Sequence, residues 1–175
     1  LAAELPVPVE VLVADLADPA DLARVAARLS ASHPTEPGEE KPAGAAQGDK
    51  VRGRPIDLLV NNAGFGTVGA FVDLPIDGAE RQVSVNILAV QRLTHAAGAA
   101  MAARGTGTIL NVASVAGFRP AARSATYGAT KAFVVGFSRA VATELAPRGV
   151  TVSCLCPGLT RTEFHRRAGY DTSGY

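Results

Sequence analysis

Residues 56–64 read IDLLVNNAG, a short continuous apolar run that ends in two asparagines, an alanine and a glycine. An uninterrupted apolar run of this length is typical of a strand in a parallel sheet, which is covered on both faces. Further strands are predicted at 108–112 (TILNV), at 150–155 (VTVSCL) and at 7–13 (VPVEVLV), where Val alternates.

Helical patterns separate these strands. Asp18 precedes Pro19, an N-cap followed by proline at the first helical position, and this predicts a helix to about residue 29. Apolar residues at helical spacing predict two more helices, over 78–103 and 124–146. Strands that alternate with helices form β-α-β units with right-handed crossovers. The sequence therefore predicts an α/β fold, a doubly wound Rossmann-like domain with a parallel sheet.

Composition narrows the class of protein. The 175 residues are enough for one domain with a buried core, and 47% hydrophobic against 19% charged residues excludes a disordered chain. A net charge of +1 without a polybasic block gives no reason to expect nucleic acid or an anionic membrane as a partner. No apolar run approaches the roughly 18 residues of a membrane-spanning helix. Two cysteines exclude a disulfide scaffold and predict a reducing, cytoplasmic compartment.

Residues 31–55 differ from the rest of the chain. They contain four prolines and four glycines with almost no large apolar side chains, so they predict a mobile surface loop within a single domain over residues 1–175. The chain begins with Leu1 and without a signal-peptide pattern, and we therefore expect a fragment of a longer protein.

The predicted strand ends carry the candidate functional residues. In open α/β sheets, ligands bind beyond the carboxyl ends of the strands. Here those ends carry Asp15, residues 61–64, Ser114 and residues 157–158. These positions would line one cleft along a single edge of the sheet.

Tyr127 and Lys131 are four positions apart on a predicted helix, so their side chains share a face. An ammonium beside a phenol favours the phenolate and lowers its pKa, which suits proton exchange with a carbonyl or alcohol oxygen. Ser114, at the end of the preceding strand, could hydrogen-bond the same oxygen. The alternative is a surface Tyr-Lys pair without function.

Two other patterns have competing interpretations. Residues 64–69 match G-x-G-x-x-G but lead into an extended, proline-broken segment rather than into a helix. We therefore interpret these glycines as positions where the backbone passes close to a ligand, and not as a pyrophosphate loop. Cys154 and Cys156 lie on one side of a strand end, and we interpret them as structural thiols. No metal site is predicted, because no ligand spacing connects the histidines, which are His33, His95 and His165.

Five motifs in this order and spacing resemble the classical short-chain dehydrogenase/reductase family. They are Asn61-Asn62-Ala63-Gly64, Asn86, Ser114, Tyr127-x-x-x-Lys131 and Pro157-Gly158. The resemblance covers nearly the whole chain except residues 31–55. The stretches NNAGFGTVGAF, ILNVASVAGF and YGATKAFVVGFS are similar to bacterial 3-oxoacyl and 3-ketosteroid reductases.

The resemblance implies a ketoreductase that moves a hydride between the nicotinamide of NAD or NADP and a carbonyl or secondary alcohol. It makes Tyr127 the general acid/base, with Lys131 lowering its pKa and binding the nicotinamide ribose. Ser114 would orient the substrate carbonyl, and Asn86 would hold a water in a proton relay. The resemblance implies further cofactor-binding residues besides Tyr127 and Lys131. Asp15 and Leu16 would contact the adenine, and Asn61, Ala63 and Gly64 would line the ribose. The nicotinamide would be held by Pro157, Gly158, Thr160 and Thr162.

Parts of the family pattern have no match here. The first two strands, the glycine-rich loop between them and the last strand are missing, so the preference for NAD or NADP is not readable. Because the family orders its strands 3-2-1-4-5-6-7, the strand at 7–13 should be separated by a gap from the strand at 56–60, or should pair abnormally. The resemblance also implies a homo-oligomer, a dimer or tetramer built on the helices at 78–103 and 124–146.

Two alternatives remain open from the sequence. The chain could be a non-catalytic remnant that acts only by association, because the glycine-rich loop is missing. It could also share the fold with nucleotide-sugar epimerases, which have Tyr-x-x-x-Lys but lack the run at residues 61–64.

Overall fold

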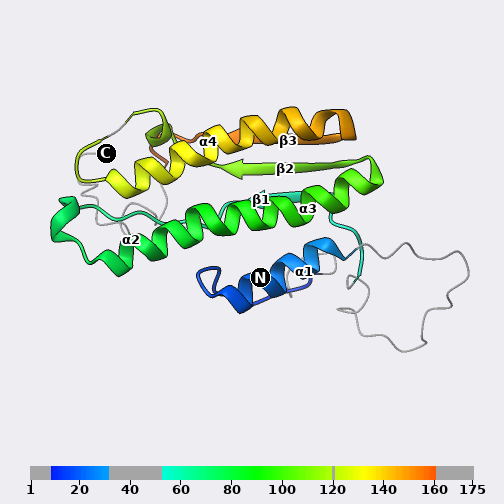
Figure 1. Cartoon of the computed structure of the whole chain (residues 1–175), viewed down its shortest axis with the longest axis horizontal. Coiled ribbons are helices and arrows are strands. Elements are labelled where there is room, and N and C mark those ends of the chain that lie inside the picture. Colours follow the sequence, from blue (N-terminus) through cyan, green and yellow to red (C-terminus); the bar gives the residue numbers. More distant parts are fainter. Residues whose placement is uncertain (1–8, 32–52, 120, 161–175) are drawn as a thin grey trace, which may run out of the picture.

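The computed structural model describes residues 9–31, 53–119 and 121–160 (Figure 1). Strands and helices alternate along these ranges, as the sequence predicts. The strands are β1 (Leu58–Asn61), β2 (Gly107–Val112) and β3 (Val150–Leu155), and the principal helices are α1 (Pro19–Ser30), α2 (Ile76–Val83), α3 (Val90–Arg104) and α4 (Ala125–Leu145).

The three strands form one parallel sheet in the order β1-β2-β3. Leu59 of β1 pairs with Ile109 of β2, which pairs in turn with Val152 of β3. All three carboxyl ends therefore lie at the same edge of the sheet. This arrangement confirms the predicted α/β class with a Rossmann-like parallel sheet.

The described helices pack on one face of this sheet. α3 lies over β1 and β2 with α1 against its outer side, and α4 lies over β3 (Figure 1). The larger core cluster joins α1, α3 with the residue before it, and all three strands through Leu22, Leu59, Ala89, Leu93, Ala97, Met101, Ile109 and Val150. A smaller cluster under α4 contains Val90, Ala113, Val134 and Val135.

The opposite face of the sheet carries apolar side chains that remain accessible. Leu58 and Val60 of β1 are 55% and 47% exposed, and Leu155 of β3 is 50% exposed. Side chains alternate between the two faces of a strand, so these residues point away from the helices. Most of the core is therefore on one side of the sheet.

Local signals explain where the helices begin and end. The Asp18 carboxylate caps α1 by accepting hydrogen bonds from the backbone N–H groups of Ala20 (2.9 Å) and Asp21 (2.8 Å), with Pro19 at the first helical position. α3 ends at Gly105, whose φ of 74° is in the left-handed region that glycine adopts without strain.

The predicted helix over 78–103 is correct in extent but not in regularity. α2 and α3 are joined by a π-helical segment, η3 (Ser84–Ala89), so one rod runs from residue 76 to residue 104. Nothing in the hydrophobic spacing distinguishes this segment from an α-helix. π-helical turns occur often at functional sites, and this one contains Asn86.

The predicted strand at 7–13 is wrong over its described part. Residues 9–13 form no strand and pair with none of the three described strands. The segment instead lies along α1, where Arg28 pairs with Glu10 at 2.9 Å and Arg24 donates to the Val13 carbonyl at 2.7 Å. The reason is that alternating Val needs a neighbouring strand, and no described residue supplies one next to this segment.

Candidate active site

The segments that follow the three strands enclose a cavity of about 350 Å³ at the carboxyl edge of the sheet. Its lining residues come from after β1, after β2, after β3 and from the first turns of α4. They are Asn62, Gly64, Val112, Ala113, Ser114, Val115, Ala116, Tyr127, Lys131, Pro157, Gly158, Leu159 and Thr160. Three of the four predicted catalytic residues therefore meet at one cavity.

Ser114 is held by its own turn and by the end of β3. Its side-chain oxygen accepts a hydrogen bond from the backbone N–H of Ala116 at 3.1 Å, which begins the short 3₁₀ turn η4 (Val115–Gly117). On either side of it, Ala113 donates to the Leu155 carbonyl at 2.7 Å and Val115 donates to the Pro157 carbonyl at 3.0 Å. These backbone bonds hold Ser114 on the wall of the cavity.

Tyr127 and Lys131 lie one turn apart on α4, and both are buried, at 8% and 6% exposure. Lys131 Nζ donates to the Val112 carbonyl at 2.8 Å and lies 5.8 Å from the centre of the Tyr127 ring. The ammonium is thus anchored to the end of β2, beside the phenol. The predicted pairing of these two side chains is present in the structure.

The surroundings of Lys131 affect its protonation. Burial lowers the pKa of the Lys131 ammonium from its ordinary value, and the negative charge that the Cys154 and Cys156 thiolates would carry opposes part of that shift. Both thiols are half-buried on the α4 side of β3. Burial also raises the pKa of the Cys156 thiol.

Asn86 lies in the π-helical segment and is almost fully buried. Its Nδ2 donates to the Phe65 carbonyl (2.9 Å) and to the Thr130 hydroxyl (3.1 Å), and its Oδ1 accepts from the Phe65 N–H at 3.2 Å. The side chain therefore joins three parts of the site, which are η3, the segment after β1 and α4.

Gly64 faces Asn86 and Lys131 at close range. A Cβ atom at this position would lie 3.0 Å from Asn86 Oδ1 and 3.6 Å from Lys131 Nζ. The missing side chain leaves a bare backbone beside the ammonium, and a ligand can approach it there. As predicted, the glycines after β1 do not open directly into an α-helix, since α2 begins at Ile76. The segment between them is not fully extended as predicted, because it contains the short 3₁₀ turn η2 (Phe71–Asp73).

Asn61 has a different environment from the one that the resemblance implies for its side chain. The side chain is buried, and its Nδ2 donates to the Thr94 hydroxyl (3.0 Å) and to Asn111 Oδ1 (2.8 Å), while Asn111 donates onward to Ser138 at 2.9 Å. This polar network ties β1 and β2 to α3 and α4.

The residues expected at the adenine end lie apart from the main cavity. Leu16 lines a second hollow of about 290 Å³, which it shares with Asn61 and Ala63, two residues expected at the ribose. Asp15 lines neither hollow, and its carboxylate pairs with Arg81 at 2.8 Å. That hydrogen bond holds the pKa of Asp15 below its usual range.

The residues after β3 complete the cavity. Pro157, Gly158 and Thr160 all contribute to its lining, and the Thr160 hydroxyl donates to the Gly158 carbonyl at 3.2 Å. Thr162 and residues 32–52 of the predicted loop lie outside the described residues. The sequence analysis missed Thr130, whose hydroxyl accepts from Asn86, although its place three residues after Tyr127 puts it near the same helix face.

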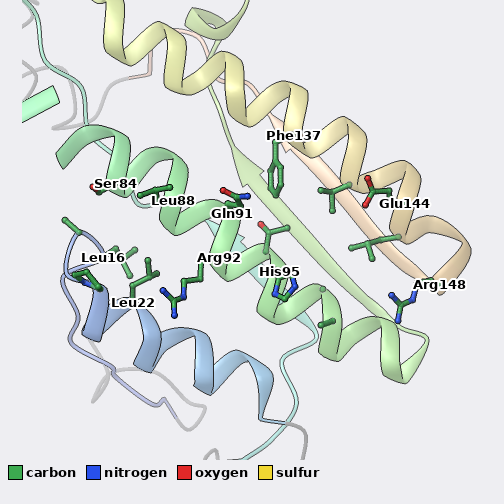
Figure 2. Close-up of a pocket in the computed structure, with 17 residues that line it drawn as sticks. Leu16, Leu22, Ser84, Leu88, Gln91, Arg92, His95, Phe137, Glu144 and Arg148 are labelled. Atoms are coloured by element: carbon green, nitrogen blue, oxygen red, sulfur yellow. The ribbon is translucent and has the colours of Figure 1, made fainter. Parts of the chain in front are cut away.

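A separate groove of about 750 Å³ runs along α3, with α1 on one side and α4 on the other (Figure 2). Figure 2 shows Phe137 pointing from α4 toward α3, with His95 and Arg92 on α3 and Leu16 and Leu22 on the α1 side. The groove contains none of the predicted site residues except Leu16.

No three or more His, Cys, Asp or Glu side chains of the described ranges lie close enough together to hold a metal ion. None of the helices in those ranges combines the length and the apolar character needed to cross a membrane.

Three observations indicate the same class of protein. They are the cavity at the carboxyl edge of the sheet, the grouping of Ser114, Tyr127 and Lys131 in it, and the comparison with protein families. The family model described as short chain dehydrogenase matches residues 42–172. The chain belongs to this family, and it spans about half the length of the curated relatives it matches.

Individual relatives support the same assignment. Acetoacetyl-CoA reductase from Shinella zoogloeoides is 37% identical over 112 residues, covering 64% of this chain and 46% of the relative. A short-chain dehydrogenase from Sphingobium yanoikuyae, solved in complex with NADPH, is 40% identical with a TM-score of 0.78, covering 95% of this chain and 57% of that one. The bulky-bulky ketone specific alcohol dehydrogenase from Comamonas testosteroni is 36% identical with a TM-score of 0.74, covering 91% and 55%.

Proposed function

We propose that this chain carries the catalytic part of an NAD(P)-dependent oxidoreductase that acts on a carbonyl or secondary alcohol. The observation that carries this proposal is the meeting of Ser114, Tyr127 and Lys131 at one cavity beyond the carboxyl ends of the strands. The family membership of the chain supports it, and so does the NADPH complex of its relative from Sphingobium yanoikuyae.

The residues present fit the nicotinamide and ribose end of such a cofactor. Gly64 presents a bare backbone beside Lys131 Nζ, and Pro157 and Gly158 form the facing wall. Lys131 would bind ribose hydroxyls, and Pro157, Gly158 and Thr160 would hold the nicotinamide. Leu16, Asn61 and Ala63 would line the adenosine side, with Asp15 reaching the adenine once its pairing with Arg81 opens. The bound cofactor would supply or accept the hydride.

Residues of this chain would transfer the proton to and from the substrate oxygen. Tyr127 would donate its phenolic proton to the substrate oxygen during reduction and take it back during oxidation. The Lys131 ammonium, 5.8 Å from the ring centre, favours the phenolate that forms when the proton leaves. A buried site strengthens this attraction, because little water is present to screen it.

Ser114 would act on the substrate carbonyl, and Asn86 would act on the path between Lys131 and solvent. The Ser114 oxygen accepts from Ala116, so its own proton can be donated to the substrate carbonyl. Asn86 Oδ1 accepts one hydrogen bond, from Phe65, and a carbonyl oxygen has room for a second. A water bound there would connect Lys131 with solvent in a proton relay.

The test is the Tyr127→Phe substitution in the complete protein, measured by the loss of NADPH absorbance with a ketone substrate. Turnover should be abolished, while NADPH binding measured by fluorescence should be retained. Thr143→Ala, an exposed change at the far end of α4, is the control for the helix itself. Wild-type turnover in the Phe variant would refute the role of Tyr127.

The proposed substrate class is a ketone of the 3-oxoacyl or ketosteroid kind. The sequence stretches similar to those reductases support this choice, and so do the names of two relatives, an acetoacetyl-CoA reductase and a bulky-bulky ketone specific alcohol dehydrogenase. Parallel rates with a 3-oxoacyl thioester, a ketosteroid and a sugar acid would test it. A clear preference for the sugar acid would refute it.

One observation favours a second candidate, a non-catalytic remnant that acts by association. Within the described residues, no glycine-rich loop opens directly into an α-helix. A fluorescence titration with NADPH distinguishes the two, because a remnant would not bind the cofactor. Saturable binding by this chain would exclude the remnant.

We also propose that the protein is a cytoplasmic homo-oligomer, with residues 1–175 forming part of one NAD(P)-binding domain. The groove along α3 supports self-association, since small or apolar side chains such as Ala99, Phe137 and Val141 line it. The two free thiols fit a reducing compartment. Light scattering of wild type and Phe137→Glu would test the oligomer, and an unchanged mass would refute the role of this groove.

A further inference from the structure

The two cysteines of the chain lie next to each other at the end of β3. Cys154 Sγ and Cys156 Sγ are 3.8 Å apart, and both side chains are half-buried rather than sealed in the core. Buried thiols ordinarily serve as small apolar side chains. We propose that Cys154 and Cys156 form a reversible modification site, in which a peroxide converts the two thiols into an intramolecular disulfide.

The geometry allows this bond with a small local movement. Residues i and i+2 of a strand point to the same side, with Cα atoms roughly 6.4–6.8 Å apart. A disulfide accepts Cα separations up to about 6.8 Å but needs the sulfur atoms about 2.05 Å apart. Cys156 lies one residue beyond Leu155, the last residue of β3, so a contraction affects only the end of the strand pairing.

The oxidation balances with hydrogen peroxide as its co-reactant, and the reverse step needs a dithiol, which is itself oxidised as it reduces the bond to two thiols. One thiolate attacks peroxide, which breaks the O–O bond and gives a sulfenic acid and one water after proton transfer. The second thiol then attacks the sulfenic sulfur, forming the S–S bond and releasing a second water. Two thiols are oxidised and one peroxide is reduced. Burial and the neighbouring Cys154 raise the pKa of the Cys156 thiol, and the charge of Lys131 opposes part of that rise.

The site is connected to the segment that positions Ser114. The residue that follows each cysteine accepts one of the two backbone hydrogen bonds that hold the Ser114 segment. Ala113 donates to the carbonyl of Leu155 (2.7 Å), and Val115 donates to the carbonyl of Pro157 (3.0 Å). A contraction between Cys154 and Cys156 shifts both acceptor carbonyls. We therefore expect disulfide formation to loosen the Ser114 segment, a structural effect that does not depend on the proposed enzymatic function.

Mass spectrometry of the purified chain tests the bond. Trypsin should release residues 149–161 as one peptide containing both cysteines of the chain. After limited hydrogen peroxide, unfolding and treatment with N-ethylmaleimide, this peptide should carry no label and be lighter by two hydrogen atoms. Dithiothreitol should restore two labels. Two labels after peroxide, sulfinic acids that resist reduction, or cross-links between chains would each overturn the proposal.

Matched controls separate the folded site from ordinary thiol chemistry. Cys154→Ser and Cys156→Ser should each accumulate sulfenic or sulfinic acid, and neither should give the peptide that is lighter by two hydrogen atoms. The folded wild type should give a several-fold higher ratio of disulfide to sulfinic acid than the same chain in urea, because only the fold holds the sulfur atoms at 3.8 Å. An equal ratio would show that the fold makes no such site.

Hydrogen exchange tests the connection to the Ser114 segment. The amides of Ala113 and Val115 should exchange several-fold faster in the oxidised chain than in the reduced chain, because their acceptor carbonyls shift. The amides of the α1 helix, on the far side of the fold, serve as the internal reference (Figure 1). Identical exchange at Ala113 and Val115 in the two states would overturn the connection.

Discussion

Gly117 lies where α4 comes closest to the turn after β2, and Gly117→Ala tests whether this contact sets the position of the active-site helix. A Cβ atom on Gly117 would lie 2.8 Å from the Lys131 carbonyl oxygen, 2.9 Å from the Lys131 carbonyl carbon and 3.0 Å from the Ala132 nitrogen. All three atoms belong to the backbone of α4. No side-chain rotation can relieve this crowding, so the turn and the helix must separate.

The distance of this movement and its cost in unfolding free energy follow from the contact distances. Ordinary contact begins at about 3.4 Å, so the 2.8 Å approach requires roughly 0.6 Å of movement between the turn and α4. Overpacking of this kind typically costs about 1–3 kcal/mol of unfolding free energy. With a urea m-value of about 2 kcal/mol per molar, the midpoint of unfolding should fall by roughly 0.5–1.5 M.

The control is Gly136→Ala, which changes the same residue type within α4 itself. Nothing lies within 4 Å of a Cβ at Gly136, so alanine should stabilise the helix by about 0.5–1 kcal/mol. The assay is urea unfolding followed by circular dichroism, with NADPH affinity measured on the same samples. Because Lys131 moves with the helix, Gly117→Ala should also weaken NADPH binding. If Gly117→Ala unfolds at the wild-type midpoint, the close approach of the turn and α4 does not exist as described.

Three further outcomes follow from other contacts. Asn111→Ala should lower the unfolding free energy by about 2–4 kcal/mol in urea titrations, because it leaves buried partners, including Ser138, without a hydrogen bond; a loss below about 0.5 kcal/mol would refute the buried network. Asp18→Ala should cost about 1 kcal/mol and speed amide exchange in the first turn of α1, since two cap bonds are lost; unchanged exchange there would contradict the cap. Arg81→Gln should raise the pKa of Asp15 toward its ordinary value in a carboxyl ¹³C titration, and an unshifted curve would show that the pair does not form in solution. The stabilisation from this pair is present above the unfolded-state pKa of aspartate and is lost as pH falls through the lower folded-state pKa.

The sequence predicts the fold well where each element carries its own signal. Pro19 after Asp18 and Gly105 after the α3 rod mark helix ends through backbone chemistry that does not depend on the rest of the fold. The strand at 7–13 shows the limit of such signals. Alternating Val predicts an extended segment with one covered face, but a strand exists only where another strand supplies the hydrogen bonds.

The candidate site was predictable to a similar degree. The spacing of Tyr127 and Lys131 along one helix fixes their shared face, and the structure places them together. The partners of Asn86 and Asn61 were not predictable, because an amide side chain bonds whatever the tertiary fold brings within reach. The Asp15 pairing with Arg81 is of the same kind, since 66 residues of chain separate the two.

The apolar side chains exposed on one face of the sheet make the stability of this chain depend on what binds to that face. Burying a side chain such as Leu58, Val60 or Leu155 is worth about 1.5–3 kcal/mol, and on this face much of that gain is still available. Any molecule that covers the face in the native state, whether another protein, a lipid or a detergent, therefore acts as a ligand of that state and raises the melting temperature by mass action. The stability of the chain then depends on its concentration and on its cosolutes, so a melting temperature has meaning only when both are stated.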